Sequence, residues 1–289
     1  MRMGTVPGAA ALRTPLRRHW GNALMLGLVW LAVAIALLPL VQVAELVVTH
    51  ALPALRWRTL TTITQGIAGG LANGLAGSAL LVALGVCLSV PVGILGGTFI
   101  AERRSGPLVA GVRLAADVLA GVPSVAVGYF GYAALVLWLH WGFSALAGGI
   151  ALAIIILPYV VRTTDFAVSA VPEPLREASL ALGADRVSTT RFVVLRAARP
   201  GIVTGALLGT GVALGETAPL IYTANWSSFM PTAHLVHAPV GYLTYMVWTY
   251  IAQPFASANA LAYAAALVLM LAVLVLSVAG RLVLGGHRA

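Results

Sequence analysis

Residues 176–200 read REASLALGADRVSTTRFVVLRAARP, a polar stretch between long apolar segments. Just before it, Pro174 suits the first turn of a helix, because that position needs no backbone N–H donor. Gly183 suits the left-handed residue that ends a helix, and Asp185 offers a side-chain cap for the next one. The sequence therefore predicts two short helices joined at a glycine.

One face of the first short helix is apolar. Leu175, Ala178 and Leu182 share this face, while Arg176 and Glu177 lie off it. We interpret the face as a surface that docks on a partner protein. The alternative is a loop that lies on lipid headgroups, attracted there by its arginines. The acidic side chains of the same stretch would weaken binding to an anionic surface, which favours the docking interpretation.

The composition is that of a membrane protein. Hydrophobic residues make up 60% of the chain, charged residues only 9%, and the mean hydropathy is +0.97. A membrane-spanning helix needs about 20 mostly apolar residues. Six stretches qualify, at approximately residues 20–49, 67–101, 108–139, 143–162, 201–224 and 258–283. A seventh apolar stretch, 240–252, is too short to span a bilayer and predicts a re-entrant or interfacial helix.

The distribution of arginines predicts the orientation, since the chain contains no lysine. With the N-terminus in the cytoplasm, only Arg56 and Arg58 fall in outer loops, in agreement with the positive-inside rule. The predicted organisation is a cytoplasmic tail (1–19), a six-helix transmembrane domain (20–284) with a cytoplasmic loop (about 163–200) and an outer loop (about 225–257), and a second cytoplasmic tail (285–289). The net charge of +9 is then a feature of membrane topology and implies no nucleic-acid partner.

The sequence does not indicate enzymatic or metal chemistry. Cys87 is the only cysteine and lies inside an apolar span, so we expect no disulfide. His234 and His237 have no third ligand candidate nearby, so we expect no metal site. No span carries a cluster of acid–base or nucleophilic side chains, and we predict no catalytic residue.

Glu216 is the carboxylate predicted to lie deepest in the membrane. It stands between Gly215 and Pro219, which loosen a helix and expose backbone groups that only protein or water can satisfy. Charged groups at such depth usually face a water-filled path or a partner of opposite charge. We interpret Glu216 as a residue of the substrate pathway; a buried structural glutamate is the alternative.

Two further pairs of opposite charge lie in or near predicted spans. Arg162 and Asp165 are spaced i, i+3 on one helix, so they can face each other. They fit a pathway or gating pair, and equally an arginine that extends from a span end toward the headgroups. Arg113 and Asp117 are spaced i, i+4 in the third span, and we predict a structural pair there.

The polar stretch resembles the cytoplasmic loop of permease subunits from ABC importers. That loop has the pattern E-A-A, three residues, G, nine residues, I-x-L-P. The matching residues here are Glu177-Ala178-Ser179, Gly183, Val193 and Leu195. Arg196 stands where the pattern has proline.

Three more blocks narrow the resemblance to the PstA-type phosphate permeases. They are GVPSV at 121–125, LPYVVRTTD at 157–165 and GETAPL at 215–220. The similarity runs from about Ser78 to the C-terminus. It implies an all-α membrane protein of the type I ABC importer permease architecture, with six transmembrane helices and a cytoplasmic coupling-helix loop, in the bacterial cytoplasmic membrane.

The resemblance also implies partners. These are a sister permease of the PstC type, two ATP-binding subunits and an extracytoplasmic phosphate-binding protein, with membrane lipid around the helices. The ATP-binding subunit would be contacted by Arg176, Glu177, Ala178, Ser179 and Gly183. A chain without lysine cannot contain the phosphate-binding motif G-x-x-x-x-G-K-[ST], so we expect partner subunits to hydrolyse ATP and this chain to bind no cofactor.

One departure from the family leaves the substrate open. Phosphate permeases commonly carry a basic residue four positions before the glutamate, and Val212 occupies that position here. Either the sister subunit supplies the positive charge, or the substrate is another oxyanion such as sulfate or molybdate. A self-sufficient secondary transporter agrees less well with the sequence, because six spans leave little room for paired inverted halves.

Overall fold

The computed structural model describes residues 16–285, with side chains described for residues 22–281. The predicted tails at 1–19 and 285–289 therefore lie almost entirely outside the described residues. The chain consists of two compact parts, residues 1–48 and residues 49–289.

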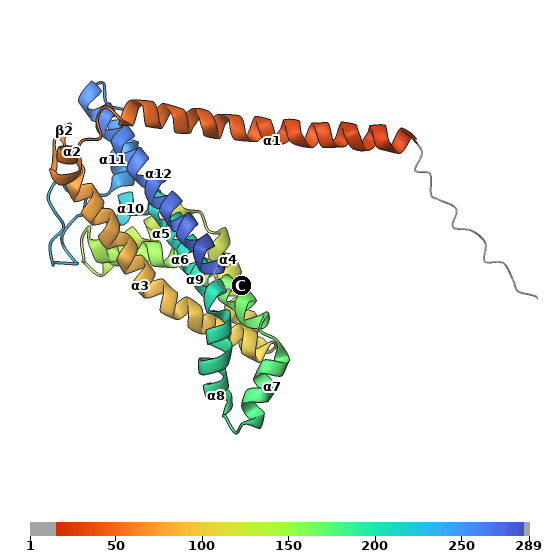
Figure 1. Cartoon of the computed structure of the whole chain (residues 1–289). Helices are drawn as coiled ribbons and strands as arrows, with labels where there is room; N and C mark the ends of the chain where they lie inside the picture. The colour runs from red at the N-terminus through yellow and green to blue at the C-terminus, as the bar shows by residue number, and fades with distance from the viewer. Residues whose placement is uncertain (1–15, 286–289) are drawn as a thin grey trace, which may run out of the picture. The chain divides into compact units, whose positions relative to one another are not determined.

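The first part contains most of α1 (Leu16–Ala51), drawn at the red end of the chain in Figure 1. Its segment Asn22–Ala51 is long and apolar enough to cross a membrane. The side chains of residues 22–43 are all exposed, among them Leu24 and Trp30. Because an apolar surface of this length is unfavourable in water, the helix requires lipid or another apolar surface around it.

The regular secondary structure described in the second part is helical apart from one small hairpin. After α2 (Trp57–Thr61), strand β1 (Thr64–Gln65) pairs antiparallel with β2 (Ala68–Gly69). The helices that follow are α3 (Ala72–Arg103), α4 (Pro107–Gly121), α5 (Ser124–Gly131), the π-helix η1 (Tyr132–Trp138), α6 (Ala145–Ser169), α7 (Glu173–Ala181), α8 (Arg186–Ser188), the π-helix η2 (Thr189–Val194), α9 (Leu195–Gly215), α10 (Ala218–Thr223), α11 (Leu243–Tyr250) and α12 (Ala256–Gly285). The predicted second span, 67–101, therefore begins later than expected, because positive φ angles at Gly66 and Gly69 form the hairpin instead of a helix.

Helix α6 is the centre of the second part. It packs against α3, α4, α5, α9 and α10. Glycines allow the closest of these approaches: a Cβ atom at Gly93 would lie 2.7 Å from Val160, and one at Gly209 would lie 2.9 Å from Ile156. Small residues at helix interfaces are typical of membrane proteins, because they let neighbouring backbones approach closely.

The third predicted span, 108–139, is not one straight helix. It consists of α4 and of α5 with η1, which meet at 101°. Pro123 explains the break, since proline disfavours the helical conformation of the residue before it, and Val122 is indeed extended, with ψ of 127°. The structure thus contains five continuous candidate spans among the described residues, or six if this bent pair is one span.

The fifth predicted span, 201–224, is also interrupted. A continuous helical segment, Arg186–Gly215, starts earlier than expected and stops before Glu216, which is extended. The short α10 follows and packs against α5, where a Cβ atom at Gly128 would lie 2.5 Å from the Cα atom of Pro219. The segments that follow the two helix breaks, α5 and α10, therefore pack against each other.

The prediction for residues 240–252 agrees with the structure, because α11 is too short to cross a bilayer. Tyr242 and Met246 are buried, and α11 packs on α12. Ser78 accepts a hydrogen bond from the backbone N–H of Leu243 at 2.9 Å, which fastens α11 to the first turns of α3.

Replacement of Gly97 by alanine tests the packing of α3 on α6. A Cβ atom at Gly97 would lie 2.5 Å from the carbonyl oxygen of Val161, so the two helices would have to separate. Overpacking of this kind typically costs about 1–3 kcal/mol, and we expect a lower midpoint of thermal unfolding in detergent. The matched control is Gly96→Ala, whose Cβ atom would meet nothing nearer than 3.6 Å. Equal midpoints for the two variants would contradict this packing.

Candidate functional site

The α7–α8 hairpin contains the residues predicted to couple the chain to a partner. Figure 1 shows it at the opposite end of the second part from α2 and α11. Gly183 has a φ of +87° and follows the end of α7, as the sequence predicts. The N–H of Ala184 donates to the carbonyl of Ser179 at 3.2 Å, and that of Gly183 donates to Leu180 at 3.0 Å. This pair of bonds is the Schellman helix stop.

Asp185 caps the second helix of the hairpin, in agreement with the sequence. Its carboxylate accepts a hydrogen bond from the backbone N–H of Ser188 at 3.0 Å. The hydrogen bonds from Ser188 lower the pKa of Asp185 below its usual value. The expectation that this second helix is short is wrong, because α8 continues through η2 into α9.

The outward surface of α7 and of the turn after it is apolar and uncovered. Leu182 is 90% exposed, and Leu175 and Leu180 are about half exposed. Glu177 and Ala178 are exposed beside them. Leu180 instead lines the pocket between α7 and α8, and we call the other four residues (Leu175, Glu177, Ala178 and Leu182) the α7 outer face.

Arg176 and Ser179 point the other way, into the protein. The sequence places Arg176 away from the docking face; in the structure its side chain is buried and forms an ion pair with Glu102, at the end of α3. Its guanidinium also donates to the carbonyl oxygen of Val168 on α6 at 2.9 Å. The hydroxyl of Ser179 bonds that of Thr189 at 2.9 Å. These contacts fasten α7 to α3, α6 and η2.

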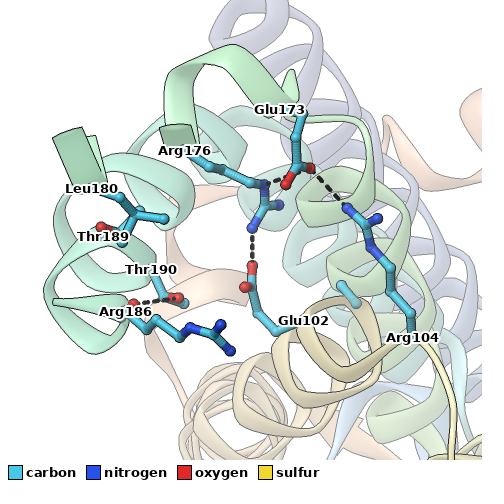
Figure 2. Close-up of a pocket in the computed structure, with 9 residues that line it drawn as sticks. Glu102, Arg104, Glu173, Arg176, Leu180, Arg186, Thr189 and Thr190 are labelled. Atoms are coloured by element: carbon cyan, nitrogen blue, oxygen red, sulfur yellow. Dashed lines mark hydrogen bonds and ion pairs between the residues drawn. The ribbon is translucent and has the colours of Figure 1, made fainter. Parts of the chain in front are cut away.

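The ion pair belongs to a larger network, drawn with dashed lines in Figure 2. Glu173 lies 3.8 Å from Arg176 and 2.8 Å from Arg104. Two residues of α7, Arg176 and Glu173, therefore alternate in charge with two residues at the end of α3, Glu102 and Arg104. The network lines a pocket of about 330 Å³, into which Arg186 extends from the opposite side. The sequence analysis missed Glu102 and Arg104. Their position, directly after an apolar span that ends on the same side as the coupling loop, is the signal that could have identified them.

A second group of charges joins α4 to α6, and its pairing differs from the one predicted. Arg162 contacts Asp117 at 2.6 Å, and Arg113 lies 3.6 Å from Asp165. The predicted pairs within one helix, Arg162 with Asp165 and Arg113 with Asp117, are therefore replaced by pairs between helices. We call these four residues the α4–α6 charge quartet.

The direction of the two helices explains the exchange of partners. As residue numbers rise along α4 they fall along α6, so each arginine lies opposite an aspartate of the other helix. Asp165 also accepts a hydrogen bond from Ser169 at 3.3 Å. Three of the four side chains are about half exposed, and Asp165 is 26% exposed. The quartet thus combines mutual neutralisation with access from outside the chain.

Glu216 lies away from the quartet, at the break between α9 and α10. Gly205 of α9 lies against Thr163, the neighbour of Arg162, since a Cβ atom at Gly205 would collide with the Thr163 side chain. Gly205 therefore marks the level of the quartet on α9, and Glu216 follows it by eleven residues. At a rise of 1.5 Å per residue this separation is roughly 16 Å. The Glu216 carbonyl accepts a hydrogen bond from the Thr244 hydroxyl at 2.8 Å. Its carboxylate forms no ion pair with any side chain in the described range 22–281.

Val212 lies one turn before Glu216 and faces α12. It lines a mostly apolar groove of about 450 Å³ between α9 and α12, together with Leu208 and Val273, and Arg281 of α12 lines the same groove. The position at which the resemblance predicts a basic residue therefore carries an apolar side chain, and the basic residue of this groove is Arg281.

The chain matches a known family over most of its length. The family model for binding-protein-dependent transport system inner membrane components matches residues 93–284. The phosphate transport system permease protein PstA 2 of Mycobacterium tuberculosis is 42% identical over 251 residues, which are 86% of this chain and 83% of that protein. PstA of Pasteurella multocida is 38% identical over 268 residues, 92% of this chain and 95% of its own.

The fold agrees with these sequence matches. A chain of the MetNI methionine ABC transporter, in an inward-facing conformation, superposes with a TM-score of 0.60 at 19% identity. The superposition covers 75% of this chain and 96% of that one, and it confirms the predicted type I ABC importer permease architecture. The chain therefore belongs to the family of binding-protein-dependent transport system inner membrane components and, within it, to the PstA permeases.

Proposed function

We propose that this chain is the membrane-spanning permease subunit of an ATP-driven, binding-protein-dependent importer of inorganic phosphate. The two relatives named as phosphate permeases support the substrate. A PstC-type sister permease, two ATP-binding subunits and an extracytoplasmic phosphate-binding protein complete the transporter. The partners hydrolyse ATP, this chain binds no cofactor, and both of its termini lie in the cytoplasm of a bacterial cell.

The observation that carries this proposal is the construction of α7, which is apolar and open on one side and bonded to the transmembrane helices on the other. The α7 outer face docks on an ATP-binding subunit. Because Arg176 fastens α7 to α3 and α6, movement of the docked subunit pulls on these helices. The result is a rigid-body change between inward-facing and outward-facing states.

The α4–α6 charge quartet serves as a gate near the cytoplasmic end of the pathway. Phosphate cannot cross an apolar core without compensation of its charge. An arginine offers two parallel hydrogen bonds to a phosphate group, as it does to a carboxylate. When phosphate arrives, Arg162 and Arg113 exchange their aspartates for it, and when it leaves, the pairs between α4 and α6 form again.

Glu216 contributes to the same pathway through the sister permease. A carboxylate repels phosphate, so we assign it to an arginine of that subunit and not to the substrate. Transport of another oxyanion is the alternative that the apolar side chain at position 212 supports. Measurement of phosphate uptake in the presence of sulfate or molybdate as a competitor distinguishes a phosphate permease from a permease for another oxyanion.

Leu182→Asp tests the α7 outer face. A charge at this exposed position should weaken docking, because it would have to lose its water at the interface, and the few residues that dominate an interface each cost about 2 kcal/mol or more when truncated. We expect a large loss of phosphate uptake and of the ATP-binding subunits that co-purify, with the chain still folded in the membrane. Phe229→Asp is the matched control, since Phe229 is 74% exposed and lies in the outer loop. Normal co-purification with Leu182→Asp would refute docking through this face.

Arg176→Gln tests the link between α7 and the transmembrane helices. Loss of one partner from a buried ion pair typically costs about 3–5 kcal/mol, whereas an exposed pair contributes about 0–1 kcal/mol. We expect more ATP hydrolysed per phosphate taken up, because docking persists while its movement is transmitted poorly. Glu102→Gln should act in the same direction. The control is Arg104→Gln, since the Arg104 side chain is 71% exposed. The proposed link is wrong if neither Arg176→Gln nor Glu102→Gln changes this ratio.

Charge reversal tests the quartet. Arg162→Asp alone should lower uptake at least tenfold, because it places three carboxylates together. Adding Asp117→Arg restores opposite charges across the helices and should restore much of the uptake. The matched control adds Asp165→Arg instead: net charge is again unchanged, but the introduced arginine would then face Arg113. Equal rescue by the two double variants would contradict the pairing between helices.

A further inference from the structure

A groove runs between the end of α3 and the segment formed by α8, η2 and the start of α9. Its volume is about 860 Å³. One end is apolar and is lined by Ile94, Leu95, Phe99 and Leu195. The other end carries Arg103 and Arg186, and Arg191 lies between Arg186 and Leu195 along the second wall. The groove therefore changes from apolar to basic along its length.

The three arginines of the groove are available for an anion. None of them forms an ion pair with another side chain in the described range 22–281. The guanidinium of Arg103 lies 5.7 Å from the centre of its neighbour Phe99. The carboxylate of Glu102 also lines the groove but is engaged by Arg176. The basic end consequently carries excess positive charge.

The two sides of the groove follow the same gradient. On α3 the apolar-to-basic direction runs from Ile94 to Arg103, and on the opposite side it runs from Leu195 to Arg186. The run on α3 covers nine residue steps, or about 14 Å at the rise of an α-helix. The opposite run also covers nine steps, but most of it is the π-helix η2. With the orientation proposed above, the apolar end lies deeper in the membrane and the arginines lie toward the cytoplasm.

We propose that this groove binds an anionic phospholipid, with its phosphate on the arginines and an acyl chain along α3. Basic pockets between helices on the cytoplasmic side are typical sites for anionic headgroups. Free phosphate would leave the apolar end unoccupied, whereas a phospholipid matches both ends. The groove is open to such a ligand, since Leu95 is 72% exposed and Val187, on its other wall, is 71% exposed.

The bound lipid also has a structural consequence. It joins α3 to the α8–η2 segment next to Glu102, which holds Arg176 of α7. An anionic lipid in this position stabilises the hairpin that carries the α7 outer face. The inference uses the proposed membrane orientation but not the identity of the transported substrate, so lipid binding and phosphate uptake can fail independently.

Native mass spectrometry of the assembled transporter tests the proposal, with phosphatidylglycerol or phosphatidylcholine added in detergent. We expect the wild type to retain phosphatidylglycerol in preference to phosphatidylcholine. Each arginine beside an anionic lipid contributes about fivefold to binding, so Arg103→Gln with Arg191→Gln should weaken retention roughly 30-fold. The matched control is Arg196→Gln with Arg199→Gln, two exposed arginines that follow on the same segment outside the groove.

A second variant tests the apolar end without a change of charge. Leu95→Trp fills the groove at an exposed position and should also reduce retention of phosphatidylglycerol. The proposal would be overturned if the groove and control arginine variants both retained phosphatidylglycerol as the wild type does. It would also be overturned if both lost the lipid equally, because an equal loss indicates diffuse electrostatic attraction. A photoreactive residue at Leu95 should crosslink to lipid, and crosslinking to another subunit instead would show that protein covers the groove.

Discussion

The close approach of α3 and α9 to α6 is the contact on which the second part of the chain depends. Lipid tails are as apolar as the helix surfaces, so helices in a membrane associate through packing and hydrogen bonds more than through exclusion of water. Glycines on α3 and α9 bring the backbones of these helices against α6, at positions such as Gly97 and Gly205. Since α4 also packs on α6, this one helix determines which charges meet across the bundle.

The two helix breaks follow from the same requirement for satisfied backbone groups. Irregular backbone at membrane depth is tolerated where protein or water covers it. The segments after the breaks, α5 and α10, pack against each other through Gly128 and Pro219. Thr244 supplies a hydrogen bond to the carbonyl of Glu216. The family blocks GVPSV and GETAPL thus mark positions where the chain stops being helical and finds other partners.

The two groups of charged side chains differ in burial, and this difference suits them to different roles. The Arg176 side chain is 11% exposed and is bonded to both α3 and α6, so it suits a fixed mechanical link. The α4–α6 charge quartet is more exposed and pairs one to one, so its partners can be exchanged at lower cost. Desolvation explains the difference, because an arginine deprived of both water and its carboxylate is far less stable than one that water can reach.

The sequence by itself determined the apolar segments, the helix stop at Gly183, the cap at Asp185 and the shortness of α11. Each of these depends on residues within a few positions of one another. It also located the charged residues in the spans, but it paired Arg162 with Asp165 and Arg113 with Asp117, and it did not connect Arg176 to Glu102. Only the tertiary structure decided these partners, since a sequence shows neighbours on one helix, whereas the register between antiparallel helices is set by packing along their whole length.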